Sequence, residues 1–251
     1  MTSSKTPWPE RIWRSQYGLD VARGDVAESR PISTFGEYVS SGPMNEQPVW
    51  ETTMGSTFVV PNRVQLSVVS TSAADTGQIV LHYLDGDLNE QTEVITLTGL
   101  TPVLTQAADV RAVLSAYHRG GPPAGDVTMT SGGVTYGKIG VGSVQLDTSF
   151  FRVPAGKIFV VHSLYAGAVS GTSAARVVIK IQTTRVLLDS YADEGILYPL
   201  AAVGVQDTSV TLGLPHPLAV PSGEWIGLTA TSNKAADVTA GLFGWIEPIR
   251  G

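Results

Sequence analysis

Short segments in which apolar and polar residues alternate dominate the chain from about residue 57 onward. Val64–Val69, Gln78–Tyr83 and Glu93–Leu97 are rich in β-branched residues and follow this two-residue period. Such a period is typical of β-strands with one buried face. Further strands are expected at 58–60, 110–117, 126–136, 158–164, 175–183, 210–212, 225–230 and 238–246. The sequence therefore predicts an all-β protein, with a helix within 107–117 as a local alternative.

Turn signals divide this β-rich region into two parts. Asp85-Gly86 is a tight-turn signal within the first part, because glycine accepts a positive φ at no steric cost. The second part opens with the corner Val153-Pro154-Ala155-Gly156-Lys157, and residues 220–224 repeat the same pattern. We expect two β-sandwich or jelly-roll-like domains, over 51–146 and 147–251, preceded by an extended N-terminal arm over 1–50.

The first fifty residues have sparse, large and aperiodic apolar side chains. A segment of this kind cannot build a core of its own, yet tryptophan is costly to leave in water. Two arrangements remain open: the arm docks on a neighbouring subunit, or it folds back on its own domain. For docking, the candidate residues are Trp8, Trp13, Tyr17, Arg23, Asp25, Phe35 and Trp50. Within this set, Arg23-Gly24-Asp25 is interpreted as a turn rather than as a receptor-binding tripeptide.

Charge and cysteine content exclude several functions. The formal net charge is −6 and the basic residues form no cluster, so nucleic acid is not an expected partner. The chain has no cysteine, which excludes disulfides and thiolate chemistry. Residues 1–10 lack the apolar core of a signal peptide. The sequence also contains no apolar run long enough for a membrane helix.

Three motifs resemble chemical sites but fail in detail. Residues 132–138 match the start of a phosphate-binding loop, but Ile139 stands where a magnesium-binding Ser or Thr is required. Asp85, Asp87 and Asn89 have the spacing of half a calcium loop without its glycine and final glutamate. We interpret these motifs as a hairpin loop and an acidic turn, with weak ion binding at 85–90 left open. The four histidines include no helical ligand pair, so no metal site is expected.

Catalysis is not expected either. The sequence contains no Gly-x-Ser-x-Gly elbow, and its carboxylates crowd two predicted turns, at 85–93 and 189–194. We predict a protein that is not an enzyme and holds no cofactor. Trp225 and Trp245 lie in strongly apolar segments and are expected in the core. The candidates for contact with a surface glycan are Asp85, Asp87, Tyr191 and Tyr198.

Several stretches together resemble a group of structural proteins from tailed bacteriophages. The first are Tyr17–Val26, Phe35-Gly36 and Val49-Trp50 in the arm. The others are Leu81–Asp85, Asn89-Glu90 and Glu93–Gly99 in the first β-domain, and Val153–Lys157 at the opening of the second. The sequence departs from this group at Phe35-Gly36-Glu37, where a basic residue and an asparagine are expected.

The resemblance implies a virion component with no catalytic residues. Its expected partners are major capsid, portal or tail subunits and further copies of itself, as a trimer on the head or a ring at the tail. The protein would be made in the host cytoplasm and act in the virion, decorating or stabilising the particle. Alternatives are a tail adaptor or fibre-attachment component, and a carbohydrate-binding module that contacts the host surface.

Overall fold

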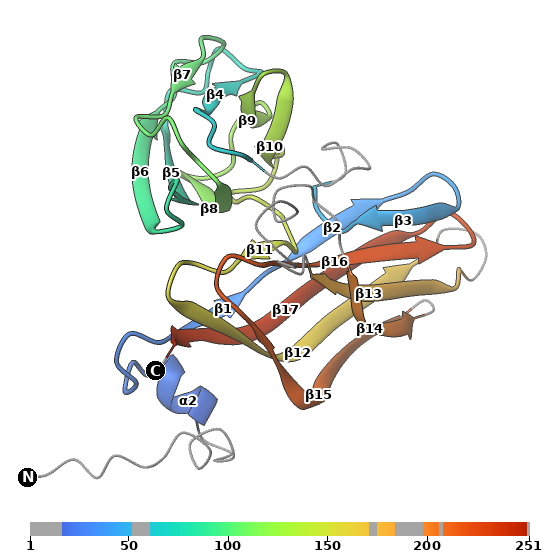
Figure 1. Cartoon of the computed structure of the whole chain (residues 1–251). Helices are drawn as coiled ribbons and strands as arrows, with labels where there is room; N and C mark the ends of the chain where they lie inside the picture. The colour runs from blue at the N-terminus through green and yellow to red at the C-terminus, as the bar shows by residue number, and fades with distance from the viewer. Residues whose placement is uncertain (1–16, 52–60, 171–174, 184–197, 206–207, 250–251) are drawn as a thin grey trace, which may run out of the picture.

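The computed structural model describes residues 17–51, 61–170, 175–183, 198–205 and 208–249. Nearly all regular structure in these residues is β-strand, which confirms the all-β prediction (Figure 1). The elements are α2 (Tyr17–Ala22), β1 (Arg30–Ser33), β2 (Gly36–Val39), β3 (Met44–Pro48), β4 (Ser67–Ser70), β5 (Gln78–Leu84), β6 (Glu90–Thr96), β7 (Val103–Leu104), β8 (Ala112–Arg119), β9 (Val127–Ser131), β10 (Val134–Ile139), β11 (Phe151–Arg152), β12 (Lys157–Val169), β13 (Val177–Thr183), β14 (Tyr198–Val205), β15 (Thr208–Val220), β16 (Trp225–Ser232) and β17 (Asp237–Pro248).

The larger domain is a jelly roll made of two antiparallel sheets. In the first, called the β17 sheet, the order is β1-β17-β12-β15, and β2 continues the edge formed by β1. In the second, called the β16 sheet, the order is β11-β16-β13-β14, and β3 lies on the β11 edge. From β11 onward, the chain changes sheet at every connection except the one between β13 and β14, and it also changes sheet between β2 and β3. Each sheet is thus four strands wide, as in jelly rolls made of two Greek keys.

The structure corrects the expectation of an extended arm for residues 17–51. β1 and β2 pair with β17, and β3 pairs with β16, so this segment supplies an edge to both jelly-roll sheets. Residues 17–22 form a short helix rather than extended chain. The apolar residues of this segment are sparse because each strand buries only a few side chains, among them Ile32, Met44 and Val49, in a core built mostly by the distant C-terminal half.

The smaller domain, residues 61–146, is inserted between β3 and β11 (Figure 1). It packs a four-stranded sheet, β10-β9-β4-β7, against a three-stranded sheet, β6-β5-β8. Between them lies a separate core with Leu66, Ile79, Leu81 and Met129 at its centre. The segment with the alternative helix prediction forms β8, because its buried side chains alternate with exposed ones at positions such as Ala116 and Tyr117.

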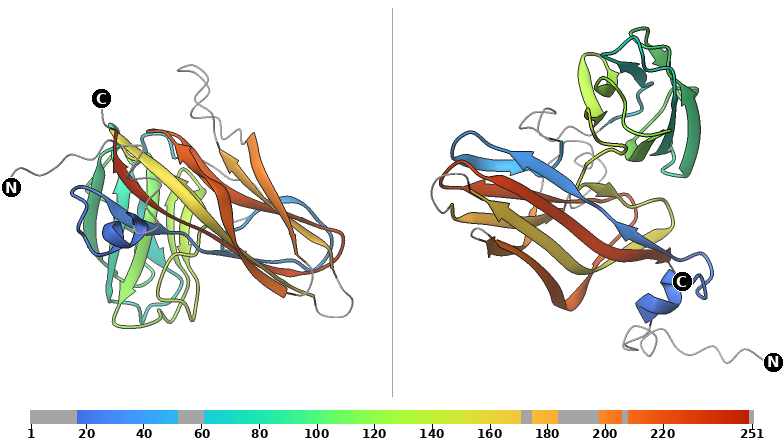
Figure 2. Two further views of the ribbon diagram at one scale, coloured as in Figure 1. Left: turned by 90° about the horizontal axis from the view of Figure 1, so that it is seen from below. Right: turned by 180° about the vertical axis from the view of Figure 1, so that it is seen from behind.

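A third apolar cluster joins the two domains. It contains Trp50, Phe150 and Trp225 from the jelly roll and Leu84 and Ala112 from the inserted domain. The buried Arg152 side chain also crosses the junction. Its Nε donates to the Gly223 carbonyl oxygen, and its Nη1 donates to the Arg111 carbonyl oxygen, each at 3.1 Å. Views from below and from behind show the inserted domain standing at one end of the jelly roll (Figure 2).

Candidate interaction surfaces

The outer face of the β17 sheet is broad and nearly free of charge. In each of its strands, side chains that enter the core alternate with side chains that point outward, so the outer set follows from the buried one. Beyond the part near α2, where His162 lies beside Trp245, the outward residues are Phe35, Glu37, Val39, Ser163, Tyr165, Gly167, Val169, Ser209, Thr211, Gly213, Asp237, Thr239, Gly241 and Phe243. None of these described residues is Lys or Arg, and the right-hand view of Figure 2 looks onto this face.

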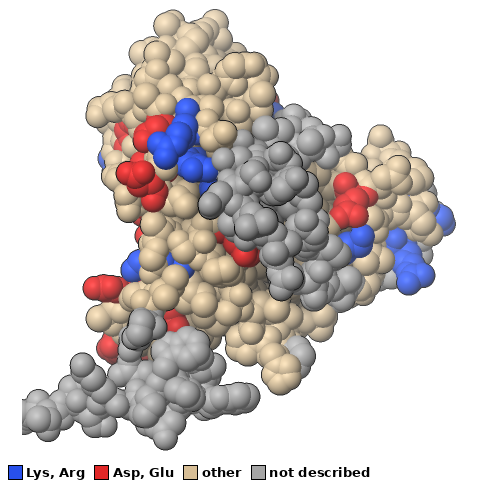
Figure 3. Space-filling model, viewed as in Figure 1, with Lys and Arg blue, Asp and Glu red and all other residues tan. Residues whose placement is uncertain are grey.

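Aromatic and aliphatic side chains interrupt this otherwise small-residue face. The rings of Phe35 and Tyr165 lie 6.5 Å apart between centroids. Val39 and Val169 both lie opposite Asp237, on either side of β17, and remain 47% and 65% exposed. Figure 3 looks at the molecule from the opposite side, where Lys, Arg, Asp and Glu stand out in a few small groups. The low charge and the exposed rings of the β17 sheet face are two features of the central part of a protein interface.

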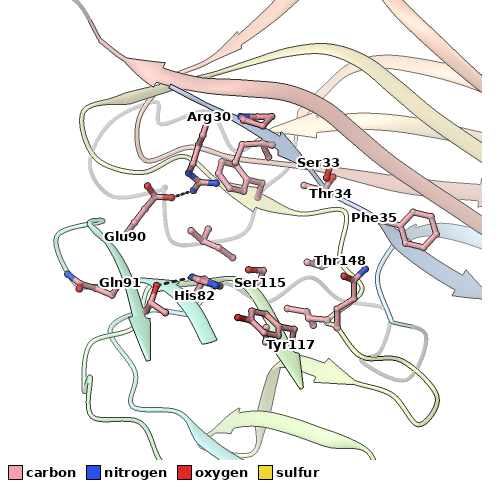
Figure 4. A pocket seen from close by; sticks show the side chains of 18 residues that line it. Arg30, Ser33, Thr34, Phe35, His82, Glu90, Gln91, Ser115, Tyr117 and Thr148 are labelled. Atoms are coloured by element: carbon pink, nitrogen blue, oxygen red, sulfur yellow. Dashed lines mark hydrogen bonds and ion pairs between the residues drawn. The ribbon is translucent and has the colours of Figure 1, made fainter. Parts of the chain in front are cut away.

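A cleft of about 700 Å³ lies between the two domains. One wall is β1 with the following Thr34 and Phe35, and the other consists of β5, β6 and β8 of the inserted domain (Figure 4). Arg30 and Glu90 form an ion pair across one end of the cleft, and Phe35 lies toward the opposite end. The cleft therefore exists only because the two domains are held side by side.

Two rings from neighbouring strands of the inserted domain face this cleft. His82 in β5 and Tyr117 in β8 stack with their centroids 6.2 Å apart and their planes inclined by 29°. The His82 ring is fixed by a hydrogen bond of 2.9 Å between Nδ1 and the Thr92 hydroxyl. Tyr117 is 39% exposed, which is high for a strand tyrosine inside a hollow. The rest of the lining divides between uncharged polar residues, among them Ser33, Thr34, Gln91, Ser115, Gln145 and Thr148, and apolar residues such as Ile32, Leu114, Leu146 and Phe151.

Acidic groups gather where the chain enters and leaves the inserted domain. Glu51 and Asp147 lie side by side there, with the Glu51 amide donating to the Asp147 carbonyl oxygen at 3.0 Å. Burial, followed by the charges of Glu37 and Glu51, raises the pKa of the Asp147 carboxyl. Lys138 lies 3.7 Å from Glu51 and 2.8 Å from Asp126, so it offsets part of this negative charge.

The predicted docking residues of the arm do not share one surface. Tyr17 is buried against Trp245 and donates a hydrogen bond to Glu247, and Trp50 is buried in the junction between the domains. Both are covered by this chain itself, which corrects their expected role on a neighbour. Arg23 and Asp25 lie in the turn after α2, whose amides bond back to Leu19 and Asp20 carbonyl oxygens, so the turn prediction is confirmed. Phe35 remains 41% exposed.

The two predicted glycan-contact residues of the first domain, Asp85 and Asp87, have different environments. The Asp85 carboxylate accepts hydrogen bonds from the amides of Asp87 and Asn89 and from the Gln91 side chain, so it caps its own turn. Burial alone would raise the pKa of Asp85, but these hydrogen bonds outweigh it and hold the pKa below its usual range. Asp87 is exposed.

Four of the predicted site residues give no side-chain geometry. Trp8, Trp13 and Tyr191 lie outside the described residues, and for Tyr198 only the backbone, in β14, is described. Trp225 and Trp245 are 3% and 7% exposed, so their predicted burial is confirmed.

Sequence reasoning missed the cleft residues. His82 was expected to be a strand residue, which is correct, but nothing in the sequence indicates that it stacks on Tyr117. An aromatic residue on the polar face of a predicted strand was the available signal, and 110–117 is such a strand. The opposite wall, Arg30–Phe35, lay in the segment interpreted as an arm.

The described part of the chain holds no group of three or more His, Cys, Asp or Glu side chains arranged to bind a metal ion. None of its helices is long and apolar enough to cross a membrane.

The comparisons with known proteins give no family. No family model matches the chain, and no curated protein matches it. Among solved structures, one match is to a structure of infectious bursal disease virus, Gx strain, at a TM-score of 0.20 and 11% identity, over 89% of this chain and 78% of that one. Another is to T=1 particles derived from infectious bursal virus, at a TM-score of 0.11 and 12% identity, over 89% and 79%. Likeness at these scores is too slight to group the chain with either.

Proposed function

We propose that this chain is a non-enzymatic structural protein of a virion, of the tailed-bacteriophage kind, that assembles with further copies of itself and with neighbouring particle subunits. The outer face of the β17 sheet carries the proposal. Interfaces that form assemblies are depleted in charge and enriched in aromatic residues at their centre. This face has Phe35, Tyr165 and Phe243 among glycine, serine and threonine, and only Glu37 and Asp237 are charged.

The architecture supports the same function. Jelly rolls with two sheets are used by viral capsid and lectin domains. Here the jelly roll offers a flat face, and the inserted domain stands at one end of it (Figure 2). In a two-fold contact between copies, the acidic end around Asp237 can lie away from the acidic end of the partner, because identical patches meet in opposite orientation. The sheet face therefore suits contact with a second copy.

The docking role of the N-terminal arm is now proposed for residues 1–16 alone. They contain Trp8 and Trp13, large side chains of the kind that anchor interfaces. The proposed partners are capsid, portal or tail subunits. A tail adaptor or fibre-attachment component is the alternative position in the particle.

Assembly through the sheet face is tested with a charge placed on it. In Thr239→Lys, a lysine replaces a half-exposed residue at the centre of the face. We expect native mass spectrometry of the wild type to show an oligomer and that of Thr239→Lys to show mainly the monomer, with an unchanged melting temperature. A matched control is Thr92→Lys in the inserted domain, which should leave the oligomer intact. A monomeric wild type at micromolar concentration would contradict self-assembly.

The place in the particle is tested by copy number. Mass spectrometry of purified particles should show either the hundreds of copies of a head protein or a tail ring with on the order of six or twelve. Deletion of residues 1–16 should leave both domains folded and reduce incorporation into particles. Normal incorporation of that variant would show that the docking role lies elsewhere.

A further inference from the structure

We propose that the cleft between the two domains binds a neutral saccharide, with the Tyr117 ring as the platform against which a sugar ring lies. This inference is independent of the proposed assembly. It rests on the shape of the cleft, on its two rings and on the kind of polar groups that surround them.

The dimensions of the cleft suit a small ligand. Its volume of about 700 Å³ falls within the usual range for small-molecule sites, which also occur preferentially at domain interfaces. The shared apolar cluster and the Arg152 hydrogen bonds fix the two domains to each other. The walls of the cleft are therefore set before a ligand arrives, which lowers the entropic cost of binding.

The rings give the cleft an apolar surface of defined orientation. Tyr117 stacks on His82, and His82 is held by Thr92, so one face of the Tyr117 ring rests on a fixed neighbour. An aromatic ring exposed in a hollow has an apolar face and, in tyrosine, a hydroxyl at its tip. One face of a sugar ring carries mainly C–H groups and its rim carries hydroxyls, so the two surfaces match.

The remaining lining offers hydroxyls and amides rather than free charge. Ser33, Ser115 and Thr148 can each donate and accept a hydrogen bond, and Gln145 adds an amide. These groups match the hydroxyls of a saccharide, which also donate and accept. The charges in the lining, Arg30 and Glu90, pair with each other, so a charged ligand would find no unmatched partner there. The ligand is therefore a neutral one.

A peptide added as a strand to β1 fits less well. Such binding needs a run of outward backbone donors and acceptors along the free edge. The Thr34 amide donates to the Leu242 carbonyl oxygen in β17. The backbone groups of the alternate residues, Pro31, Ser33 and Phe35, therefore point away from β17 toward the free edge. Proline has no N–H, and the Phe35 N–H already donates to the Thr148 carbonyl oxygen at 3.2 Å. Along this edge only Ser33 has a free backbone N–H, and one donor is too few for an added strand.

The test is saturation-transfer NMR on the full chain with a panel of neutral oligosaccharides: maltotriose, cellotriose, chitotriose and a galactose disaccharide. We expect transfer to at least one of them. Tyr117→Ala should weaken that binding by about tenfold or more, because it removes the apolar face against which the sugar ring lies. Tyr117→Phe keeps the ring and should retain most of the binding.

Histidine variants supply a matched pair. His82→Ala removes the fixed neighbour on which the Tyr117 ring rests and should weaken binding, whereas His216→Ala, an exposed histidine outside the cleft, should not. Circular dichroism and melting temperature establish that each variant is folded.

Four outcomes would overturn the proposal. The first is the absence of transfer to every panel member at millimolar concentration. The second is transfer that persists in both Tyr117→Ala and His82→Ala. The third is binding only of sialyllactose, a charged saccharide run in parallel. The fourth is a synthetic peptide of residues 1–16 that shifts the Ser33 and Tyr117 resonances while the saccharides do not, which would assign the cleft to the arm of a neighbouring copy.

Discussion

The two domains differ in how far apart in the sequence their paired strands lie. In the inserted domain, strands pair with close neighbours in sequence, such as β5 with β6 and β9 with β10. In the jelly roll, β1 pairs with β17, so that Arg30 lies opposite Ile246. A core made from nearby segments depends little on the rest of the chain, whereas a core closed by distant segments is lost when either end is removed. The difference separates local from global determinants of stability within one protein.

Deletion of residues 17–51 should have the largest effect. It removes β1, β2 and β3 from the edges of the two jelly-roll sheets. The strands on which they pair, at Ile246 in β17 and Leu228 in β16, then lose their cover. We expect the jelly roll to unfold and the inserted domain to remain folded, as seen by amide hydrogen exchange. The complementary fragment 61–146 should fold alone. A jelly roll that stays protected from exchange without residues 17–51 would restore the separate-arm interpretation.

A glycine-to-alanine change in one strand of each domain adds a single methyl group, and its cost can be compared between the two domains. In the jelly roll, a Cβ at Gly241 would collide with the Thr34 carbonyl oxygen on the neighbouring chain segment. In the inserted domain, a Cβ at Gly137 would lie 3.1 Å from the flexible Met129 sulfur. Gly241→Ala should cost about 3 kcal/mol and Gly137→Ala less than about 1 kcal/mol, because backbone cannot yield as a methionine can. Urea unfolding measures both, and equal costs would contradict the argument.

Asp75 gives the inserted domain a pH dependence of its own. Burial alone would raise its pKa, but hydrogen bonds from Ser70, Ala124 and Gly125 outweigh burial and hold the pKa below the ordinary value of 3.8. The resulting stability is present above that value and is lost as the pH falls through the lower folded pKa. Asp75→Asn should cost about 2 kcal/mol at neutral pH, and the cost should shrink in acid, as followed by thermal unfolding.

Asp147, at the junction, should respond with the opposite sign. Its folded pKa is raised, so the folded state holds the proton more tightly, and stability falls as the pH rises from the ordinary value of 3.8 to the raised one. Asp147→Asn should therefore stabilise the protein at neutral pH by about 1 kcal/mol. The gain should vanish below pH 3.8. A destabilised variant at neutral pH would mean that the carboxylate has a favourable partner.

The Arg30–Glu90 ion pair should have the smallest effect. Its side chains are 48% and 34% exposed, so solvent screens their attraction. Arg30→Ala and Glu90→Ala should each change the free energy of unfolding by less than about 0.5 kcal/mol. A double-mutant cycle isolates the coupling, and a value well above 1 kcal/mol would show that the two domains depend on this contact.

The sequence predicted the local half of the structure well. The alternation in Gln78–Tyr83 and Ala175–Thr183 identified β5 and β13 within a few residues, and Asp85-Gly86 marked the turn between β5 and β6. Arg30–Val39 was missed as a strand pair because its apolar residues have no period. What makes it a strand is β17, whose free edge it completes some two hundred residues later in the chain. That information lies in the partner rather than in the segment.

The same distinction applies to the sites. The capping role of Asp85 depends on its immediate neighbours and was partly visible as a turn. The cleft combines β1 with β5 and β8, and the jelly-roll face combines residues from both ends of the chain. Period alone cannot show which side chains of separate domains meet, so neither surface was foreseen.

The paired backbone of Glu51 and Asp147 means that the chain leaves the jelly roll and returns to it at nearly one point. Both ends of the inserted domain therefore join the jelly roll at adjacent positions, as in tolerated domain insertions, while the cluster around Trp50 and the hydrogen bonds of Arg152 bind the module to its base. Loops of the inserted domain that lie away from this junction should therefore accept changes in length and sequence more readily than the residues that form the junction.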